Sequence, residues 1–230
     1  MHIKGLQKTT LLDFPDRVAG TVFTGGCNFR CPVCDNASLV LSPSIVTEIP
    51  MEEFFSFIKK RKGILDGVCI TGGEPLLQHD IIPFIERIKA EGYDVKLDTN
   101  GYRPDVLGDV LREELADYVA MDIKASPEKY AVTTGIKELD FSLIINSIEL
   151  LEKSGIPHEF RTTVTEDFHT EEDFEKILSL FSESTPYYLQ QFRDSGNLID
   201  GGCRGWSTAR MKSLHTELEK NHPNVHLREG

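Results

Sequence analysis

The sequence lacks a long apolar run. Its 230 residues contain no stretch near the roughly 20 apolar residues of a membrane-spanning helix, and residues 1–14 have no continuous apolar core like that of a secretory signal peptide. Basic residues are also few, since 25 Lys and Arg stand against 37 Asp and Glu, for a net charge of −12. Nucleic-acid binding depends on clustered Lys and Arg. We therefore expect a cytosolic protein that binds neither membranes nor nucleic acids.

Cysteine is scarce as well, and its number is odd. The chain has five cysteines, and Cys27, Cys31 and Cys34 lie together in Thr24–Asn36, "TGGCNFRCPVCDN". Thiols stay reduced in the cytosol, so this grouping favours metal binding or catalysis over disulfides. The remaining composition, 40% hydrophobic and 27% charged, is ordinary for a globular protein. We predict a single domain over 1–230, with its core at 13–193 and a C-terminal loop and helix at 194–230.

Strand-like and helix-like segments alternate along most of the chain. Strands are predicted at Arg17–Thr24, Gly67–Thr71, Asp94–Thr99, Tyr118–Asp122, Glu159–Val164 and Tyr187–Gln191. Helices are predicted at Met51–Lys62, Leu77–Glu91, Pro104–Glu114, Phe141–Ser154, Thr170–Phe181 and Thr208–Lys220. Gly92 and Gly155 are suited to left-handed helix ends, and Thr170 with Asp173 to an N-terminal cap. Six such units predict an α/β fold with a parallel sheet, either a barrel or an open doubly wound sheet.

Polar residues gather where each predicted strand ends. The cysteines follow the first strand, and the later strands end in "GGEP" (Gly72–Pro75), "DTNG" (Asp98–Gly101), "MDIK" (Met121–Lys124), Arg161 with Thr162, and Gln190, Gln191 and Arg193. The carboxyl ends of parallel strands meet on one face of such a fold, where reactive groups collect. These six segments are therefore predicted to converge on one pocket.

Three clustered thiols are compatible with two kinds of metal site. Structural zinc usually takes four ligands, and the fourth would be Cys69, Cys203 or a distant His. Cys69 lies inside a strand pattern and is interpreted as a small buried residue, and Cys203 as a loop thiol. An iron–sulfur cube takes one thiolate per iron, so three cysteines would leave one iron open to another ligand.

The spacing C-x3-C-x2-C, followed by "TGGEP", "DTNG" and "MDIK", resembles that of the radical S-adenosylmethionine enzymes, and the resemblance runs from Asp13 to about Arg193. The stretch "LLDFPDRVAGTVFTGGCNFRCPVCDN" is most similar to the activating proteins of anaerobic ribonucleoside-triphosphate reductase, which are relatives of pyruvate formate-lyase activating enzyme. The resemblance implies a partial (β/α)6 TIM-like barrel with parallel strands and outer helices.

The resemblance also implies roles for individual residues. Cys27, Cys31 and Cys34 would bind three irons of one [4Fe–4S] cluster, and the fourth iron would take the amino and carboxylate groups of S-adenosylmethionine. The remaining residues implied to bind this cofactor are Gly72, Gly73, Glu74, Asp98, Asn100, Asp122, Lys124, Arg161 and Gln191. A monovalent cation is implied at Asp98, Thr99 and Asp122, and Asp13 is implied to lie near the substrate peptide.

Two positions depart from the pattern that the family shows. Val33 replaces a residue that is usually aromatic and packs near the adenine, and Asp35 replaces a histidine that is usual in the activating proteins. Neither position supplies a metal ligand, so the expected chemistry is unchanged.

The implied reaction is reductive cleavage of S-adenosylmethionine to a 5′-deoxyadenosyl radical, with Lys124 beside the cofactor. The radical would abstract hydrogen from a glycine of a partner, the large subunit of anaerobic ribonucleoside-triphosphate reductase, with a flavodoxin or ferredoxin-type protein as electron donor. Three alternatives stay open: another glycyl radical enzyme as partner, a small-molecule reaction like that of 7-carboxy-7-deazaguanine synthase, and a zinc-stabilised binding module.

Overall fold

A single eight-stranded sheet forms the centre of the protein. The computed structural model describes residues 1–228, and their strands follow one another in the order β1 to β8. The strands are β1 (Ile3–Thr10), β2 (Ala19–Thr24), β3 (Gly67–Gly72), β4 (Asp94–Thr99), β5 (Tyr118–Asp122), β6 (His158–Val164), β7 (Tyr187–Gln191) and β8 (Val225–Arg228). Every neighbouring pair is parallel except β1 with β2. The fold is therefore a parallel α/β sheet with one antiparallel edge.

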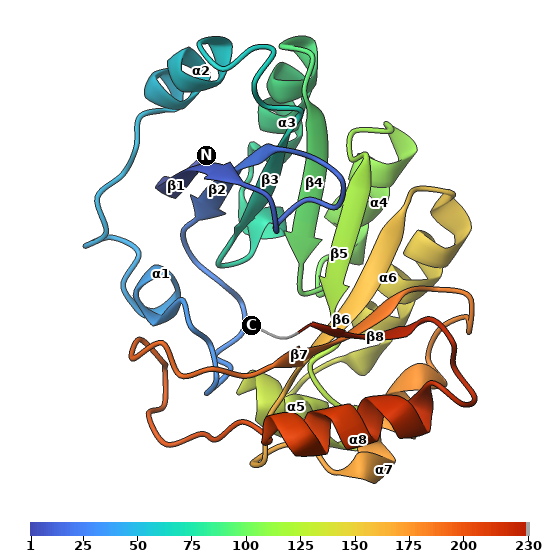
Figure 1. The fold of residues 1–230 in the computed structure, drawn as a ribbon. Helices are drawn as coiled ribbons and strands as arrows, with labels where there is room; N and C mark the ends of the chain where they lie inside the picture. Colours follow the sequence, from blue (N-terminus) through green and yellow to red (C-terminus); the bar gives the residue numbers. More distant parts are fainter. Residues whose placement is uncertain (229–230) are drawn as a thin grey trace.

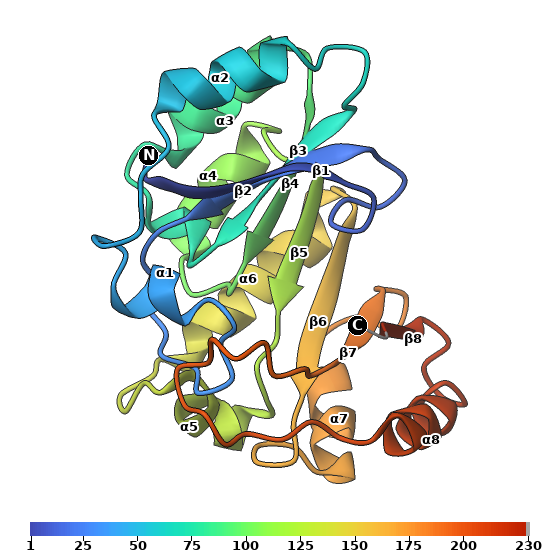
Figure 2. The same ribbon diagram turned by 60° about the vertical axis from the view of Figure 1, so that its left-hand side comes forward.

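Most of the helices lie on the outside of this curved sheet, whereas two short ones, α1 and α5, lie beyond the ends of its strands (Figures 1 and 2). The helices are α1 (Ala37–Leu41), α2 (Met51–Lys59), α3 (Ile81–Ala90), α4 (Pro104–Arg112), α5 (Tyr130–Thr134), α6 (Phe141–Ser154), α7 (Glu171–Leu178) and α8 (Thr208–Leu218), with short 3₁₀ turns at Pro75–Leu77 and Pro127–Lys129. No helix in the described part of the chain is long and apolar enough to cross a membrane.

The sheet curves like a barrel but does not close. Within residues 1–228, β1 and β8 are the two edges of the sheet and do not pair with each other. The expectation of a partial TIM-like barrel with outer helices is confirmed, although it has eight strands and not six. The C-terminal region 194–230, predicted as a loop and a helix, also contains β8.

The predicted strands β4, β5 and β7 have the observed bounds, whereas two edge strands were missed. β1 has the sequence IKGLQKTT and is largely half-buried or exposed, so it lacks the apolar content of the central strands. β8 is only four residues long. The predicted helix Leu77–Glu91 begins later, at Ile81, because Pro75–Leu77 forms a separate 3₁₀ turn.

Alternation along the central strands separates the two faces of the sheet. In β4, Val95 and Leu97 are fully buried, and Lys96 and Asp98 point to the opposite side, into the curve of the sheet. Since neighbouring residues of a strand point to opposite faces, the apolar set packs under the helices and the polar set lines the interior. The functional side chains therefore come from the inward positions.

Helix ends follow the expected capping chemistry. Gly155 ends α6 in the left-handed conformation at φ 73°, and Gly92 adopts φ 84° after α3. Before α7, Thr170 and Asp173 form a capping box as predicted, and the Thr170 backbone N–H donates to Asp173 Oδ2 at 2.7 Å.

Asp173 also links α7 to the loop after β5. Its carboxylate accepts hydrogen bonds from Ser126 Oγ at 2.7 Å and from Lys129 Nζ at 2.5 Å, and the residue is almost fully buried. Burial alone would raise the pKa of this carboxyl group, but Lys129, Thr170 and Ser126 lower it well below its ordinary value. Asp173 is therefore ionised in the folded protein.

Replacing Asp173 by Asn is expected to lower the free energy of unfolding by about 1.5–3 kcal/mol at pH 7, because a buried charged hydrogen-bond partner is lost. A depressed carboxyl pKa stabilises the fold above the unfolded-state pKa of about 3.9 and loses this effect as the pH falls. The difference between the two proteins should therefore shrink as the pH is lowered from 4 towards 2. Urea unfolding at several pH values measures it.

The matched control is Asp109→Asn, which removes an exposed ion pair with Arg112. Such surface pairs contribute about 0–1 kcal/mol. A loss in Asp173→Asn no larger than in Asp109→Asn would contradict the structural role of Asp173.

Candidate active site

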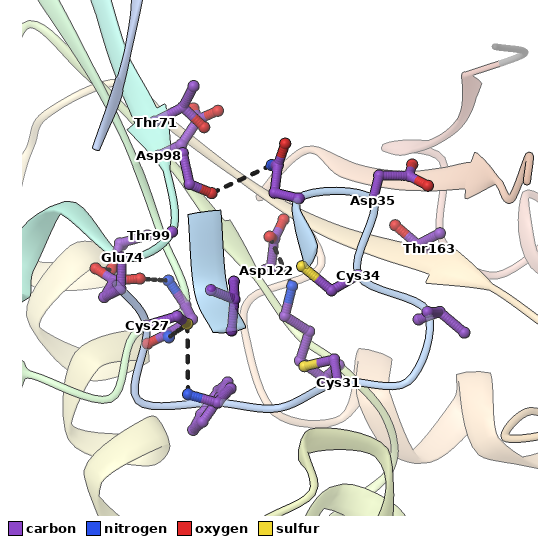
Figure 3. A pocket seen from close by; sticks show the side chains of 18 of the residues that line it. Cys27, Cys31, Cys34, Asp35, Thr71, Glu74, Asp98, Thr99, Asp122 and Thr163 are labelled. Atoms are coloured by element: carbon purple, nitrogen blue, oxygen red, sulfur yellow. Dashed lines mark hydrogen bonds and ion pairs between the residues drawn. The ribbon is translucent and has the colours of Figure 1, made fainter. Parts of the chain in front are cut away.

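A cavity opens at the carboxyl ends of the parallel strands, where the sequence predicts convergence. The predicted site residues that line it are Cys27, Cys31, Cys34, Gly72, Gly73, Glu74, Asp98, Thr99, Asn100, Asp122, Lys124 and Arg161. Figure 3 shows the loop with the three cysteines curving around Asp122, with Glu74 and Thr99 near Cys27. Residues from five successive strand ends, those of β2 to β6, therefore meet in one place.

The first part of the cysteine loop is fixed by backbone hydrogen bonds and by one buried ring. The Gly26 N–H donates to the Leu39 carbonyl at 2.8 Å, and the Arg30 N–H donates to the Thr134 carbonyl at 2.8 Å. Phe29 is buried and its ring lies 5.2 Å from that of Tyr102. Cys27 and Cys31 are thus held on a rigid part of the loop.

The glycine pair after β3 packs directly on this loop. Gly72 adopts φ 117°, and a Cβ on Gly73 would lie 1.9 Å from the Gly26 carbonyl oxygen. The Glu74 N–H donates to that same oxygen at 2.8 Å. Only glycine permits this approach of two backbones. Pro75 requires an extended residue before it, and Glu74 has φ −131° and ψ 111°.

The Glu74 side chain connects the ends of β3 and β4. It is almost fully buried and accepts hydrogen bonds from Leu76 N at 3.1 Å, Thr99 Oγ1 at 2.8 Å and Asn100 N at 2.7 Å. Burial raises the pKa of this carboxyl group to about 7, and the three hydrogen bonds oppose the rise. The Glu74 carboxylate therefore holds the ends of β3 and β4 together. The backbone of Gly72–Glu74 is the part of this segment that faces the cysteine loop.

Five charged side chains from β4, β6 and the end of β5 with the residues just after it form a row of alternating sign, and all of them except Lys96 line the cavity. Lys96 pairs with Asp98, and Arg161 Nη1 lies 3.4 Å from Asp98. Arg161 Nε then donates to Asp122 at 2.9 Å, and Lys124 Nζ donates to Asp122 at 2.8 Å. Burial would raise the pKa of both aspartates, but the neighbouring cations lower it. With both aspartates ionised, the row carries one excess positive charge.

The donor set fits an iron–sulfur cube with one open iron. Three thiols line the cavity, whereas Cys69 lies buried in β3 and Cys203 lies in the connection before α8, and neither lines it. Burial raises the pKa of Cys27 to about 12 and that of Cys31 to about 11, so the positive charge of bound iron is needed to hold them as thiolates. In residues 1–228, no three His, Cys, Asp or Glu side chains converge on a position for a single metal ion.

Two predicted residues lie away from this cavity. The Gln191 amide points towards α8, where it donates to the Trp206 carbonyl at 3.3 Å and to Thr208 Oγ1 at 3.1 Å. Asp13 accepts a hydrogen bond from Thr21 Oγ1 at 2.5 Å and lines a second, smaller cavity. The prediction that the sixth strand end reaches the same pocket is therefore wrong, because Gln190, Gln191 and Arg193 do not line it, and Thr162 of the fifth strand end does not line it either.

The second cavity lies beside the first and shares two residues with it, Asp98 and Arg161. Its other lining residues come from the β1–β2 connection and from β4, β6, β7 and β8; they are Leu12, Asp13, Pro15, Lys96, Glu159, Gln190 and Arg228. It therefore spans the gap between the two open edges of the sheet.

Several lining residues were not among the predicted binding residues, although Val33 and Asp35 stand out in the sequence as departures from the family pattern. These lining residues are Phe29, Val33, Asp35, Asn36, Val40, Thr71, Thr133 and Thr163. Thr163 could have been found, because it lies two positions after Arg161 on the same face of β6. Thr133 could not, because α5 is a five-residue helix with no recognisable periodicity.

Comparison with known proteins identifies the family. A family model described as the Radical SAM superfamily matches residues 21–181, which is more than half of the chain. The chain therefore belongs to the Radical SAM superfamily. Members of this superfamily are enzymes that use a [4Fe–4S] cluster and S-adenosylmethionine, which agrees with the three-thiol cavity.

Individual proteins that are similar to this chain have different named functions. The chain is 33% identical over 194 residues to a Methanocaldococcus jannaschii protein named for a proposed role as a glycyl-radical enzyme activating enzyme, covering 83% of this chain and 79% of that one. It is 32% identical over 115 residues, half of each chain, to 7-carboxy-7-deazaguanine synthase of Thermoplasma acidophilum. A domain of pyruvate-formate lyase-activating enzyme from Bacteroides vulgatus has the same fold, with a TM-score of 0.56 at 18% identity over 71% of this chain and 98% of that one.

Replacing Gly73 by Ala is expected to abolish most iron binding, because the added Cβ would overlap the Gly26 carbonyl oxygen next to Cys27. Iron and sulfide content after anaerobic reconstitution measures the effect, with circular dichroism as the check on folding. The matched control is Gly108→Ala within α4, where the nearest atom to the new Cβ is 3.7 Å away. This control should retain iron and gain about 0.5–1 kcal/mol of stability. A folded Gly73→Ala protein with wild-type iron content would show the contact to be unimportant.

Proposed function

We propose that this protein is an activating enzyme that generates a glycyl radical on a partner enzyme. When bound, the cluster supplies the electron that breaks the S–C5′ bond of S-adenosylmethionine, which leaves methionine and a 5′-deoxyadenosyl radical. That radical takes one hydrogen atom from a glycine Cα, so the products are 5′-deoxyadenosine and a glycyl radical. The observation that carries the proposal is the cavity with three thiols, in a chain that is 33% identical to a protein named for this role.

The residues around the cavity bind and orient the cofactors. Cys27, Cys31 and Cys34 would hold three irons, and the backbone oxygens at Gly72 and Gly73 would receive the methionyl ammonium. The excess positive charge of the row that ends in Lys124 attracts the methionyl carboxylate. Asn100 also helps to orient the cysteine loop, because its amide donates to Asn28 Oδ1 at 2.7 Å beside Cys27.

A monovalent cation at Asp98, Thr99 and Asp122 is also part of the proposal, and it would have to bind beside Arg161. Arg161 already bridges Asp98 and Asp122. Thr99 Oγ1 donates to Glu74. A cation would therefore share both carboxylates with the guanidinium group.

The second cavity supports a peptide as the substrate. Its cations Lys96, Arg161 and Arg228 balance the anions Asp13, Asp98 and Glu159, so its wall suits a neutral polar segment such as a glycine-containing backbone. A nucleotide or another multiply charged metabolite would find no excess of positive charge there.

Apolar residues beside that cavity suit a protein partner. Leu11 and Leu12 are 72% and 87% exposed, and Leu12 lines the cavity next to Asp13. Both belong to "LLDFPDR", the stretch in which the sequence most resembles activators of anaerobic ribonucleoside-triphosphate reductase. We therefore propose the large subunit of that reductase as the partner and a flavodoxin or ferredoxin-type protein as the electron donor.

A small-molecule reaction is the second candidate, because half of the chain is 32% identical to 7-carboxy-7-deazaguanine synthase. Such an enzyme would consume its substrate without a protein partner. Product formation from a small molecule alone is therefore what distinguishes the two functions.

Replacing Lys124 by Met is expected to weaken S-adenosylmethionine binding by roughly ten- to a hundredfold, because losing a charged hydrogen-bond partner in a partly desolvated site costs about 1.5–3 kcal/mol. Isothermal titration of the reconstituted protein measures this. Lys153→Met is the control, since Lys153 forms a comparable ion pair with Glu149 on the exposed surface of α6. If the two variants bound S-adenosylmethionine with equal affinity, the methionyl carboxylate would not lie at Lys124.

The deciding experiment is anaerobic electron paramagnetic resonance of the reductase mixed with this protein, a reductant and S-adenosylmethionine. A glycyl doublet is expected, and it should be absent when the reductase carries Ala at its C-terminal glycine. Cys31→Ala should give no doublet, whereas Cys69→Ala and Cys203→Ala should, because neither thiol lines the cavity. A doublet only with a different glycyl radical enzyme would change the partner, and no doublet with any would reject the function.

A further inference from the structure

The two ends of the cysteine loop are held in different ways. The end with Cys27 is fixed by the buried Phe29 ring and by the contacts with Gly73 and Glu74. The end with Cys34, residues 32–36, is half-buried or exposed. Its link to the strand ends is one hydrogen bond, from Asn36 Nδ2 to the Gly72 carbonyl at 3.2 Å. The position of Cys34 therefore depends on what else contacts residues 32–37.

Residues 194–200, here called the strap, make those further contacts from a distant part of the sequence. Ser195 Oγ donates to Asp35 Oδ1 at 3.1 Å, and Asn197 Nδ2 donates to the Asp35 carbonyl at 3.1 Å. The Asp200 N–H donates to the Pro32 carbonyl at 3.0 Å, and the Ala37 N–H donates to the Asn197 carbonyl at 3.3 Å. These four hydrogen bonds flank Cys34 on both sides.

The strap is presented to the loop in a defined shape. Gly196 adopts φ 80°, and its N–H donates to Asp194 Oδ1 at 2.7 Å. The Asn197 N–H donates to Ser195 Oγ at 3.3 Å. This turn orients Ser195 and Asn197 before they reach Asp35, so little further ordering is needed to make the contact.

Both ends of the connection that contains the strap are anchored on the body of the protein. Phe192 and Trp206 are buried, and the Trp206 ring packs at 5.7 Å on that of Phe174. The Glu166 N–H donates to the Arg204 carbonyl at 2.8 Å, and the Arg204 N–H donates to Asp167 Oδ2 at 2.8 Å. The side chains from Arg193 to Asn197 are all exposed. The part of the strap that reaches Asp35 therefore contributes polar contacts to the loop, and only Leu198 and Ile199 of the strap are half-buried.

The open sheet explains why such a connection is needed. The cysteine loop follows β2, and the strap belongs to the connection that follows β7, so the two come from opposite sides of a sheet whose edges do not pair. In Figures 1 and 2, the orange-red segment between β7 and α8 reaches across to the blue segment before α1. On the cavity side, the strap thus provides the hydrogen-bonded link that a closed barrel would supply through strand pairing.

We propose that the strap positions the Cys34 end of the cysteine loop, with Ser195 and Asn197 as positioning residues that act on the cluster through Asp35. Asp35 follows Cys34 directly, and both residues line the cavity with Val33. Fixing Asp35 therefore fixes the thiol and the cavity wall together. The proposal rests on the cluster chemistry of the superfamily and is independent of the substrate.

The test is the rate at which a chelator removes iron from the reconstituted protein. The double variant Ser195→Ala/Asn197→Ala should lose iron about tenfold faster, which corresponds to about 1.4 kcal/mol at 25 °C. Ser195→Thr keeps the hydroxyl group, so its rate should stay close to that of the wild type. The matched control is Asn224→Ala, which removes the same kind of exposed bond, from Asn224 Nδ2 to the Glu183 carbonyl at 2.9 Å, far from the cavity.

The thermal midpoint of each metal-free variant separates positioning from general destabilisation. If the strap positions the loop, only the double variant should lose iron faster. Its thermal midpoint should equal that of Asn224→Ala. An unchanged rate in the double variant would overturn it. Equal acceleration in Asn224→Ala, or a rate that follows the midpoint across all variants, would also overturn it. Since none of these readouts involves a partner enzyme, failure here leaves the proposed function untouched.

Discussion

The close approach of two backbone segments, at Gly26 and Gly73, is the constraint on which the site depends. The Gly26 carbonyl accepts the Glu74 N–H at 2.8 Å, and Gly73 N donates to the Thr24 carbonyl at 2.9 Å, so the loop after β2 packs directly on the end of β3. The Glu74 carboxylate then reaches Thr99 and the Asn100 N–H at the end of β4. Three strand ends are thus joined through one point, and the positions of Cys27 and Cys31 follow from it.

Much of the fold and of the site could be predicted from the sequence, and the missed parts have physical reasons. β4 and β5 were found because their runs combine β-branched and apolar residues. β1 was missed because an edge strand needs few buried side chains and IKGLQKTT has few. The contact between Ser195 and Asp35 joins exposed polar residues 160 positions apart, and no local pattern encodes such a pair.

The error at Gln191 shows that a strand end alone does not specify a site residue. Tyr187 and Leu189 are buried on the helix-covered face, and Gln191 continues their alternation. Gln190 therefore points inward and lines the second cavity, while Gln191 points towards α8. In β6, the same rule places Arg161 inward beside Asp122. Because successive side chains of a strand point to opposite faces, the sequence alone contains enough information to separate Gln190 from Gln191.

A sheet with two free edges has a mechanical property that a closed barrel lacks. In a closed barrel, strand number, tilt and stagger determine the diameter together. Here the width of the gap between β1 and β8 is set by the sum of the twists at seven strand pairings, each of roughly 20–25°. A change of a degree or two at each pairing adds up across the sheet without breaking a hydrogen bond. Away from the strap, whose hydrogen bonds join the two sides of the sheet at the cavity, the gap can therefore change its width at low elastic cost while each strand pair remains intact.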